Sequence, residues 1–296
     1  MSEKQTETKS NSNINWFPGH MAKAKREMSE NVKLVDMIIE IRDARVPLSS
    51  RNPLLNEVTS SKPRMIVLSK KDKAEPQITQ QWIDYLTKQG YMVIACDLIH
   101  DKNIPQRISQ ACQQVMAAKI AKLKAKGMKH VEIKAMVVGI PNVGKSTLIN
   151  SVLKKKIAKT ADKPGVTRNL QWIKVSQDVA LLDTPGVLWP KFEDQRTGYV
   201  LAVTGAINDN ILPMDEVVTF AVQYLMDNHS EKLKERYGIE VSGDVHKCID
   251  DIAISRNWVK QNNEIDYERT YALILKEIRD NQLGNISWEK CDEDGQ

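Results

Sequence analysis

Short apolar segments separated by amphipathic ones dominate the first two-thirds of the chain. Six apolar segments predict strands: Val35–Ile41, Met65–Leu68, Met92–Ala95, Ala135–Val138, Leu170–Val175 and Val179–Leu182. The first four are nearly continuous in Val, Ile, Met and Leu, which is typical of a sheet buried on both faces. Helical spacing between strands predicts helices such as Met21–Lys33, Gln77–Gln89 and Ile104–Lys126. This alternation favours an α/β fold with a mostly parallel sheet, in which the last two strands form a hairpin.

The pattern changes after about Pro190. From Asp215 onward the apolar residues recur at helical spacing, and they predict helices at Asp215–Asn228, Val245–Ala253 and Tyr267–Ile278. We therefore expect a sheet-containing domain over residues 15–205 and a small all-helical domain over residues 206–296. Residues 1–14 are polar, and we expect them to form a disordered tail.

Composition places the chain among globular proteins, with 41% hydrophobic and 27% charged residues. No apolar run approaches the ~18–20 residues of a membrane helix, and the polar start lacks a secretory signal, so we expect a cytoplasmic protein. The four cysteines lack metal-ligand spacing, which indicates reduced thiols. The net charge of +5 is a mild excess, but lysines cluster over residues 119–134 and 154–159, where they could contact phosphates.

A phosphate-binding loop is the clearest motif. The segment from Gly139 to Thr147 matches G-x-x-x-x-G-K-[ST], and it lies between a predicted strand and a helix, as such a loop must. Backbone N–H groups and the helix N-terminus would bind phosphate oxygens, Lys145 would reach the β- and γ-phosphates, and Ser146 would ligate Mg²⁺. The residues expected at the phosphates are Asn142, Val143, Gly144, Lys145, Ser146 and Thr147.

Two downstream segments fit the same nucleotide site. Asp183 ends a predicted strand and suits the second Mg²⁺-side carboxylate, and Gly186 follows it where an N–H could sense a γ-phosphate. Thr167 lies between the two motifs, and we interpret it as a switch threonine that closes on Mg²⁺ and the γ-phosphate. The tetrapeptide from Asp183 to Gly186 could by itself be a tight turn.

The choice of base rests on the segment Ser69, Lys70, Lys71 and Asp72, which follows a predicted strand. It resembles the Asn-Lys-x-Asp motif of G proteins, with Ser69 in place of Asn. A carboxylate at Asp72 can accept from guanine N1–H and N2–H₂, a donor pair that adenine lacks. Lys70 could pack over the base. Asp97 and Leu98 occupy the place of a second base-contacting loop.

The order of the motifs is unusual. The base motif precedes the phosphate loop by about seventy residues, whereas it comes last in an ordinary G domain; this order predicts a circular permutation. Three functions are compatible with a phosphate loop: an RNA-bound assembly GTPase, a G-protein switch acting on a protein partner, and a small-molecule kinase. The kinase does not explain Ser69–Asp72 and Asp183–Gly186 together.

The permuted order, Trp16–Met21 and Asp43–Pro47 together resemble the ribosome biogenesis GTPase A family, also called RbgA or YlqF. The resemblance covers roughly Asn15 to the C-terminus and is denser through Ile207. It implies a GTPase that binds the immature large (50S) ribosomal subunit and its rRNA late in assembly. It also implies that the helical domain contacts rRNA or the particle, that GTP favours binding, and that hydrolysis permits release.

The resemblance also implies two contributions to hydrolysis. Asn142 would help to hold an activating K⁺, and His20 would assist catalysis. Val187 stands where many signalling G proteins begin their water-orienting Gln region, and a hydrophobic side chain cannot orient water. We therefore expect weak intrinsic hydrolysis that ribosomal particles stimulate. Competition by alarmone nucleotides at the guanine site is a further expectation.

Overall fold

The computed structural model describes residues 18–153, 172–184, 194–241 and 243–291, with the backbone alone described over residues 18–25 and at residue 54. The strands are β1 (Met37–Asp43), β2 (Arg64–Ser69), β3 (Met92–Ala95), β4 (Ile133–Val138), β5 (Trp172–Lys174) and β6 (Val179–Asp183). They form one sheet of order β3-β2-β1-β4-β6-β5. All neighbouring strands pair in parallel except β5 and β6, which pair antiparallel. The predicted six-stranded, mostly parallel sheet and its closing hairpin are confirmed.

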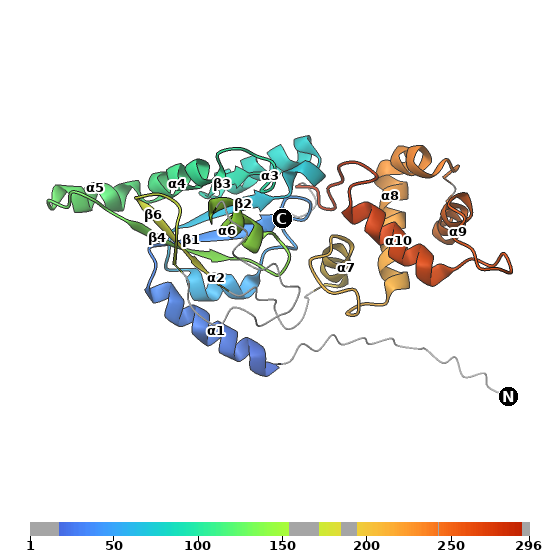
Figure 1. Cartoon of the computed structure of the whole chain (residues 1–296), viewed down its shortest axis with the longest axis horizontal. Coiled ribbons are helices and arrows are strands. Elements are labelled where there is room, and N and C mark those ends of the chain that lie inside the picture. The colour runs from blue at the N-terminus through green and yellow to red at the C-terminus, as the bar shows by residue number, and fades with distance from the viewer. Residues whose placement is uncertain (1–17, 154–171, 185–193, 242, 292–296) are drawn as a thin grey trace, which may run out of the picture.

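Helices cover both faces of this sheet (Figure 1). They are α1 (Pro18–Lys33), α2 (Pro53–Thr59), α3 (Pro76–Lys88), α4 (Ile104–Val115), α5 (Ala117–Ala125) and α6 (Lys145–Leu153). Side chains alternate along β1: Ile39 and Ile41 pack in the cluster that includes α4 and α6, whereas Ile38 packs with α1 and α2. Burial of both faces explains why these strands are mostly apolar. In β1 the exceptions are the buried Glu40, Arg42 and Asp43, and Glu40 pairs with Arg42 and Arg64.

The segment Ile104–Lys126, predicted as one helix, is two. The chain leaves helical geometry at Met116, whose side chain is buried, and α5 then continues without a buried side chain along its fully described length. The residues around Met116 carry no Gly or Pro to mark the break. Close packing of α4 on the sheet, and the smaller packing surface available to α5, therefore decide the boundary. Figure 1 shows α5 projecting beyond the sheet.

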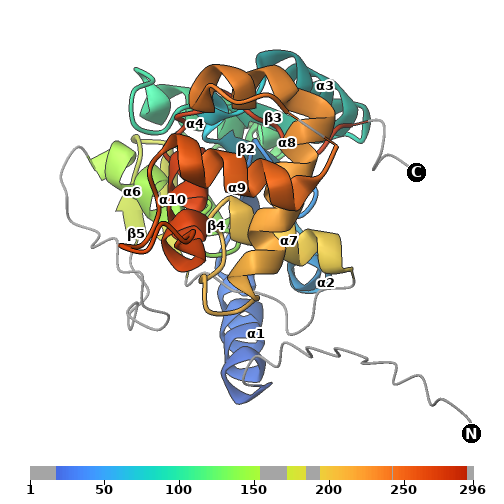
Figure 2. The same cartoon turned by 90° about the vertical axis from the view of Figure 1, so that its right-hand side faces the viewer.

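The remaining helices gather beyond one end of the sheet (Figures 1 and 2). They are α7 (Gln195–Val203), α8 (Met214–Tyr237), α9 (Val245–Ser255) and α10 (Tyr267–Arg279). After α10 the chain returns to the sheet-containing part. There the backbone N–H of Trp288 donates to the Arg45 carbonyl at 2.9 Å, and that of Ile286 donates to the Lys73 carbonyl at 3.0 Å. The domain boundary at residues 205/206 stays a prediction, since contacts join its two sides.

The four cysteines are free thiols, and burial raises the pKa of Cys96 and Cys112 to about 12. Within the described ranges no group of three or more His, Cys, Asp or Glu could hold a metal ion. The same ranges contain no helix that is long and apolar enough to cross a bilayer.

Candidate nucleotide-binding site

The predicted site segments that the structure describes meet at one edge of the sheet. Because β1, β2, β3, β4 and β6 run in parallel, the loops that follow them emerge together, and this carboxyl edge is where open α/β sheets bind ligands. The base motif follows β2, the second base loop follows β3, the phosphate loop follows β4, and Asp183 ends β6. Tertiary structure thus brings together motifs that are far apart in the chain.

Glycine is required at two positions of the phosphate loop. A Cβ on Gly139 would lie 2.7 Å from the Ile41 carbonyl oxygen, closer than a side chain can approach. Gly144 has φ +106°, and a Cβ there would lie 3.1 Å from Cδ1 of Leu98. The loop therefore passes against β1 on one side and against the loop after β3 on the other. It delivers Lys145 to the first position of α6, where free N–H groups favour an anion.

Lys145 is buried in this loop. Its Nζ donates to the carbonyl oxygens of Gly139, at 3.1 Å, and Ile140, at 2.8 Å. Burial lowers the pKa of Lys145 to about 8, against the attraction of Asp183. Burial likewise raises the pKa of Asp183, against the attraction of Lys145. A buried ammonium whose hydrogen bonds to described residues go to neutral carbonyls would gain much from a phosphate, so this loop is suited to a polyphosphate.

The expected Mg²⁺ ligands also approach this edge. Asp183 pairs in register with Val137, the penultimate residue of β4. Ser146 lies in the first turn of α6. The hydroxyl of Thr184 donates to the Val137 carbonyl at 2.6 Å, which fixes the chain just after Asp183. A hydroxyl and a carboxylate beside bound phosphates are oxygen ligands of the kind that Mg²⁺ prefers.

Ser69 joins the base motif to the phosphate loop. Its hydroxyl lies 3.0 Å from the Arg42 carbonyl and also contacts the Val143 carbonyl, so one side chain links β1, β2 and the phosphate loop. Serine therefore performs a bracing role at the position where G proteins carry asparagine.

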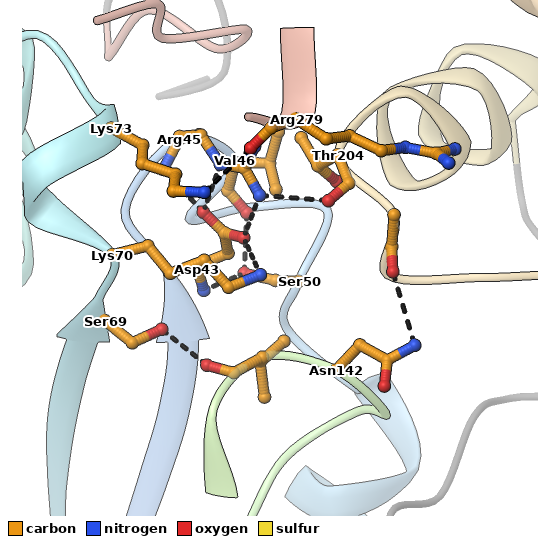
Figure 3. Close-up of polar contacts among 12 residues, drawn as sticks. Asp43, Arg45, Val46, Ser50, Ser69, Lys70, Lys73, Asn142, Thr204 and Arg279 are labelled. Atoms are coloured by element: carbon orange, nitrogen blue, oxygen red, sulfur yellow. Dashed lines mark hydrogen bonds and ion pairs between the residues drawn. The ribbon is translucent and has the colours of Figure 1, made fainter. Parts of the chain in front are cut away.

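Lys70 of the base motif, which is partly exposed, forms an ion pair with the buried Asp43 (Figure 3). Lys70 adopts a left-handed backbone conformation, with φ 55°, and its Nζ lies 2.9 Å from Oδ2 of Asp43. Arg45 donates to the same carboxylate from Nε at 3.0 Å and from Nη2 at 2.8 Å. Burial opposes ionisation, but Arg45 and Lys70 outweigh it and hold the pKa of Asp43 well below its usual range. In the described structure Lys70 is thus held by Asp43.

Asp43 and Arg45 are site residues that the sequence identified only as part of a family resemblance. A buried Asp at a strand end, two residues before an Arg, is the signal that could have placed them here. Asp72 lies in the short 3₁₀ helix Lys71–Lys73, where it is exposed and available to a base.

The second base loop contacts the phosphate loop through Leu98, which is buried against Gly144. Asp97 turns its carboxylate onto its own loop, where it accepts from the N–H groups of Ile99 and His100. The role predicted for Asp97 and Leu98 at the base stays a prediction. Lys71 pairs with Asp101 of this loop at 2.7 Å.

The C-terminal end of α7 contacts both halves of the site (Figure 3). Arg45 Nη2 donates to the Thr204 carbonyl at 3.0 Å, and Asn142 Nδ2 of the phosphate loop donates to the Gly205 carbonyl at 3.3 Å. From α10, Arg279 donates to the carbonyls of Ala202 and Val203. We call the carbonyls of residues 202–205 the α7 end. Cations and donors suit it, because a helix C-terminus carries partial negative charge.

The structure does not describe the side chains of several predicted site residues. Thr167, Gly186 and Val187 fall outside the described residues. His20 lies in α1, where the backbone alone is described. The roles predicted for these residues stay predictions.

Three comparisons bear on identity. Residues 134–241 match a family model described as a 50S ribosome-binding GTPase. A Priestia megaterium protein named "Ribosome biogenesis GTPase A" is 48% identical over 278 residues, 93% of this chain and 96% of its own. The "Mitochondrial ribosome-associated GTPase 1" of Bos taurus is 35% identical over 81% of this chain and 74% of its own.

The fold is shared with solved structures. GNP-bound YlqF from T. maritima is similar with a TM-score of 0.63 and 24% identity, over 90% of this chain and 98% of that one. A GDP-bound structure of YlqF gives a TM-score of 0.65 at the same identity. The permuted motif order, the parallel sheet and these similarities agree. The chain belongs to the ribosome biogenesis GTPase A family and is a circularly permuted G-domain GTPase of ribosome assembly that binds GTP and GDP.

Proposed function

We propose that this GTPase acts in late maturation of the large (50S) ribosomal subunit, that it binds precursor particles in its GTP state, and that hydrolysis releases it. The observation that carries the proposal is the contact of the α7 end with the base side through Arg45, the phosphate side through Asn142, and α10 through Arg279. A change at the phosphates can therefore alter the pose of the helices, which is what nucleotide-controlled binding requires.

Magnesium and potassium would complete the nucleotide site. Ser146, Thr167 and Asp183 would hold Mg²⁺, and Asn142 would help to hold K⁺ beside the phosphates. Such cations neutralise charge that develops on the phosphates during transfer. In the described structure the Asn142 amide is exposed and makes one long hydrogen bond of 3.3 Å to the α7 end, which a K⁺ ligand could give up.

Weak intrinsic hydrolysis would follow from Val187, which cannot orient water. His20 would assist catalysis when ribosomal particles bind, and alarmone nucleotides would compete at the guanine site because they carry the base that Asp72 reads. A second candidate, a G-protein switch that acts on a protein partner, is favoured if particles neither bind the protein nor raise its hydrolysis rate.

Contact with rRNA is best supported on the sheet-containing part. Residues 1–205 hold 33 Lys and Arg against 19 Asp and Glu, whereas residues 206–296 hold 10 against 19, giving +14 and −9. Helix α5 projects from the sheet with Lys119, Lys122 and Lys124 along it, and none of its side chains, all described, is buried. Such an arm could contact phosphates, and its contribution to binding should weaken with salt.

The deciding experiment measures GTP hydrolysis with and without large ribosomal subunits, in K⁺ and in Na⁺. We expect stimulation by subunits and by K⁺. Asn142 has φ 56°, so Asn142→Gly removes the amide without backbone strain and should abolish the K⁺ effect while GDP affinity is kept. His20→Ala should lose subunit-stimulated turnover at unchanged GTP affinity. Equal rates in all four conditions would contradict the proposal.

A further inference from the structure

Residues 206–296, which we call the helical part, carry a net charge opposite in sign to that of residues 1–205. Its net charge of −9 is unsuited to a surface that contacts RNA phosphates, because like charges repel.

A groove of about 560 Å³ is lined by residues of α7, α8 and α9. Figure 2 shows these three helices side by side. This volume falls within the range of ligand-binding clefts, and it exceeds what one small cation would fill. The lining residues are Tyr199, Asp215, Glu216, Thr219, Phe220, Gln223, Tyr224, Asp227 and His246. Most come from α8 at spacings of three, four and seven residues, so one face of that helix forms the floor.

Aromatic rings form the apolar part of the groove. Tyr199 and Phe220 stack with ring centroids 5.3 Å apart and planes inclined by 28°. Tyr224 is fixed by its hydroxyl, which donates to the Ser287 carbonyl at 2.7 Å, and by the Trp288 ring at 5.0 Å. These rings are held in place before any partner arrives, so a partner would not have to order them.

Carboxylates lie beside the rings. Asp215, Glu216 and Asp227 line the groove, and among its described lining residues His246 is the only basic side chain. Glu216 accepts from the Tyr199 hydroxyl at 2.7 Å; burial and this carboxylate raise the pKa of Tyr199 to about 12. On α10, burial and then Asp215 and Asp250 raise the pKa of Tyr271.

Aromatic faces and carboxylates both attract cations. Arginine satisfies the two together, since its guanidinium stacks on rings and donates to carboxylates in a fixed fork. We propose that this groove docks an arginine- and lysine-containing segment of a partner protein, and that the helical part thereby contacts protein while the lysine-rich part contacts RNA. The assignment goes beyond GTP hydrolysis and does not depend on it.

The test uses the full-length, GDP-bound protein and fluorescence anisotropy. The probe is a short fluorescein-labelled peptide of alternating arginine and glycine, compared with the same peptide carrying neutral citrulline for arginine. We expect the citrulline peptide to bind at least about tenfold more weakly. The groove variant Asp215→Asn/Glu216→Gln/Asp227→Asn should bind the arginine peptide more weakly by a similar factor. Phe220→Leu, which keeps the charge but removes the ring, should lose about threefold.

The matched control removes three carboxylates that lie away from the groove, two in loops and one on α10. Glu240, Glu264 and Glu268 are exposed, and Glu240→Gln/Glu264→Gln/Glu268→Gln changes the net charge equally. It should bind the arginine peptide as the unaltered protein does. If this control loses as much affinity as the groove variant, the attraction is diffuse and the proposal is wrong.

Other occupants give different results. If spermidine displaces the labelled peptide at concentrations well below those at which the unlabelled peptide does so, the groove is a polyamine site. If the groove variant loses affinity for a single-stranded RNA oligomer but keeps the peptide, it is a nucleic-acid site. Either result overturns the proposal. Subunit-stimulated hydrolysis of each variant is measured separately, so failure here is distinguishable from failure of the proposed function.

Discussion

The Nζ of Lys70 lies 2.9 Å from Oδ2 of Asp43, a carboxylate with no solvent exposure. Arg45 binds the same carboxylate and reaches on to the α7 end. Lys73, at the other end of the base motif, donates to the Arg279 carbonyl at the end of α10 at 2.7 Å. Contacts on both sides of the base motif therefore join it to the helices beyond the sheet.

Asp43→Asn should destabilise the protein. The change leaves two cations, Arg45 and Lys70, without their shared counter-ion in a buried site, and breaking such a pair costs about 3–5 kcal/mol of the free energy of unfolding. Urea denaturation measures the loss. The control Glu30→Gln removes the exposed partner of Lys33 and should cost less than about 1 kcal/mol. Equal losses would show that Asp43 has no special role.

Asp72→Asn should change the base preference. An amide cannot accept both guanine N–H groups, so GTP affinity should fall roughly a hundredfold, in line with the loss of a charge-assisted pair of hydrogen bonds. Xanthine presents a carbonyl where guanine presents N2–H₂, so XTP should bind the variant more tightly than GTP. Titration with fluorescent nucleotides measures both. Asp84→Asn, an equal charge change at the residue that accepts from Gln80 on α3, should leave nucleotide affinity unchanged.

Nucleotide binding should take up protons near pH 8. The pKa of Lys145 is lowered to about 8 by burial, and bound phosphates would raise it because they favour the ammonium. Affinity for GDP should therefore fall as pH rises from about 7 to about 8.5. Calorimetry in buffers with different ionisation enthalpies measures the uptake, and heats that do not depend on the buffer would disprove it.

The same shift predicts a stability change in the free protein. The unfolded chain binds the Lys145 proton more tightly than the folded one, whose pKa is depressed from 10.5 to about 8. This residue's contribution to the free energy of unfolding therefore rises with pH between those two values. A bound nucleotide should remove that rise, which urea denaturation across the pH range measures.

Arg279→Gln should loosen the α7 end. Its guanidinium donates to the carbonyls of Ala202 and Val203 and pairs with Asp209, and loss of these contacts should cost about 1–3 kcal/mol. Hydrogen exchange should accelerate in α7, with GTP affinity nearly kept. Arg269→Gln, an exposed arginine in the first turn of α10, is the matched control and should leave exchange in α7 unchanged. Slow exchange in both variants would mean that Arg279 does not fix α7.

Much of the fold could be predicted because its determinants are local. Strands buried on both faces are mostly apolar, and Gly139 and Gly144 are glycines for reasons of loop geometry. The break between α4 and α5 at Met116 could not be predicted from the sequence, since it depends on how far the sheet extends as a packing surface for these helices. The end of the first strand also depends on tertiary structure. The sequence predicted that it ends at Ile41, but β1 extends to Asp43 because the neighbouring β2 continues beside it to Ser69.

The sequence by itself determined the phosphate loop, the guanine-reading aspartate and their permuted order, because each motif needs particular residue types within a few positions. Only the tertiary structure decided which side chains hold those motifs in place. The pairing of Asp43 with Lys70, the bond from Ser69 to the phosphate loop, and the return of Trp288 to Arg45 join residues from distant parts of the chain. No local pattern encodes such contacts, since they exist only when parallel strands bring their carboxyl ends to one edge.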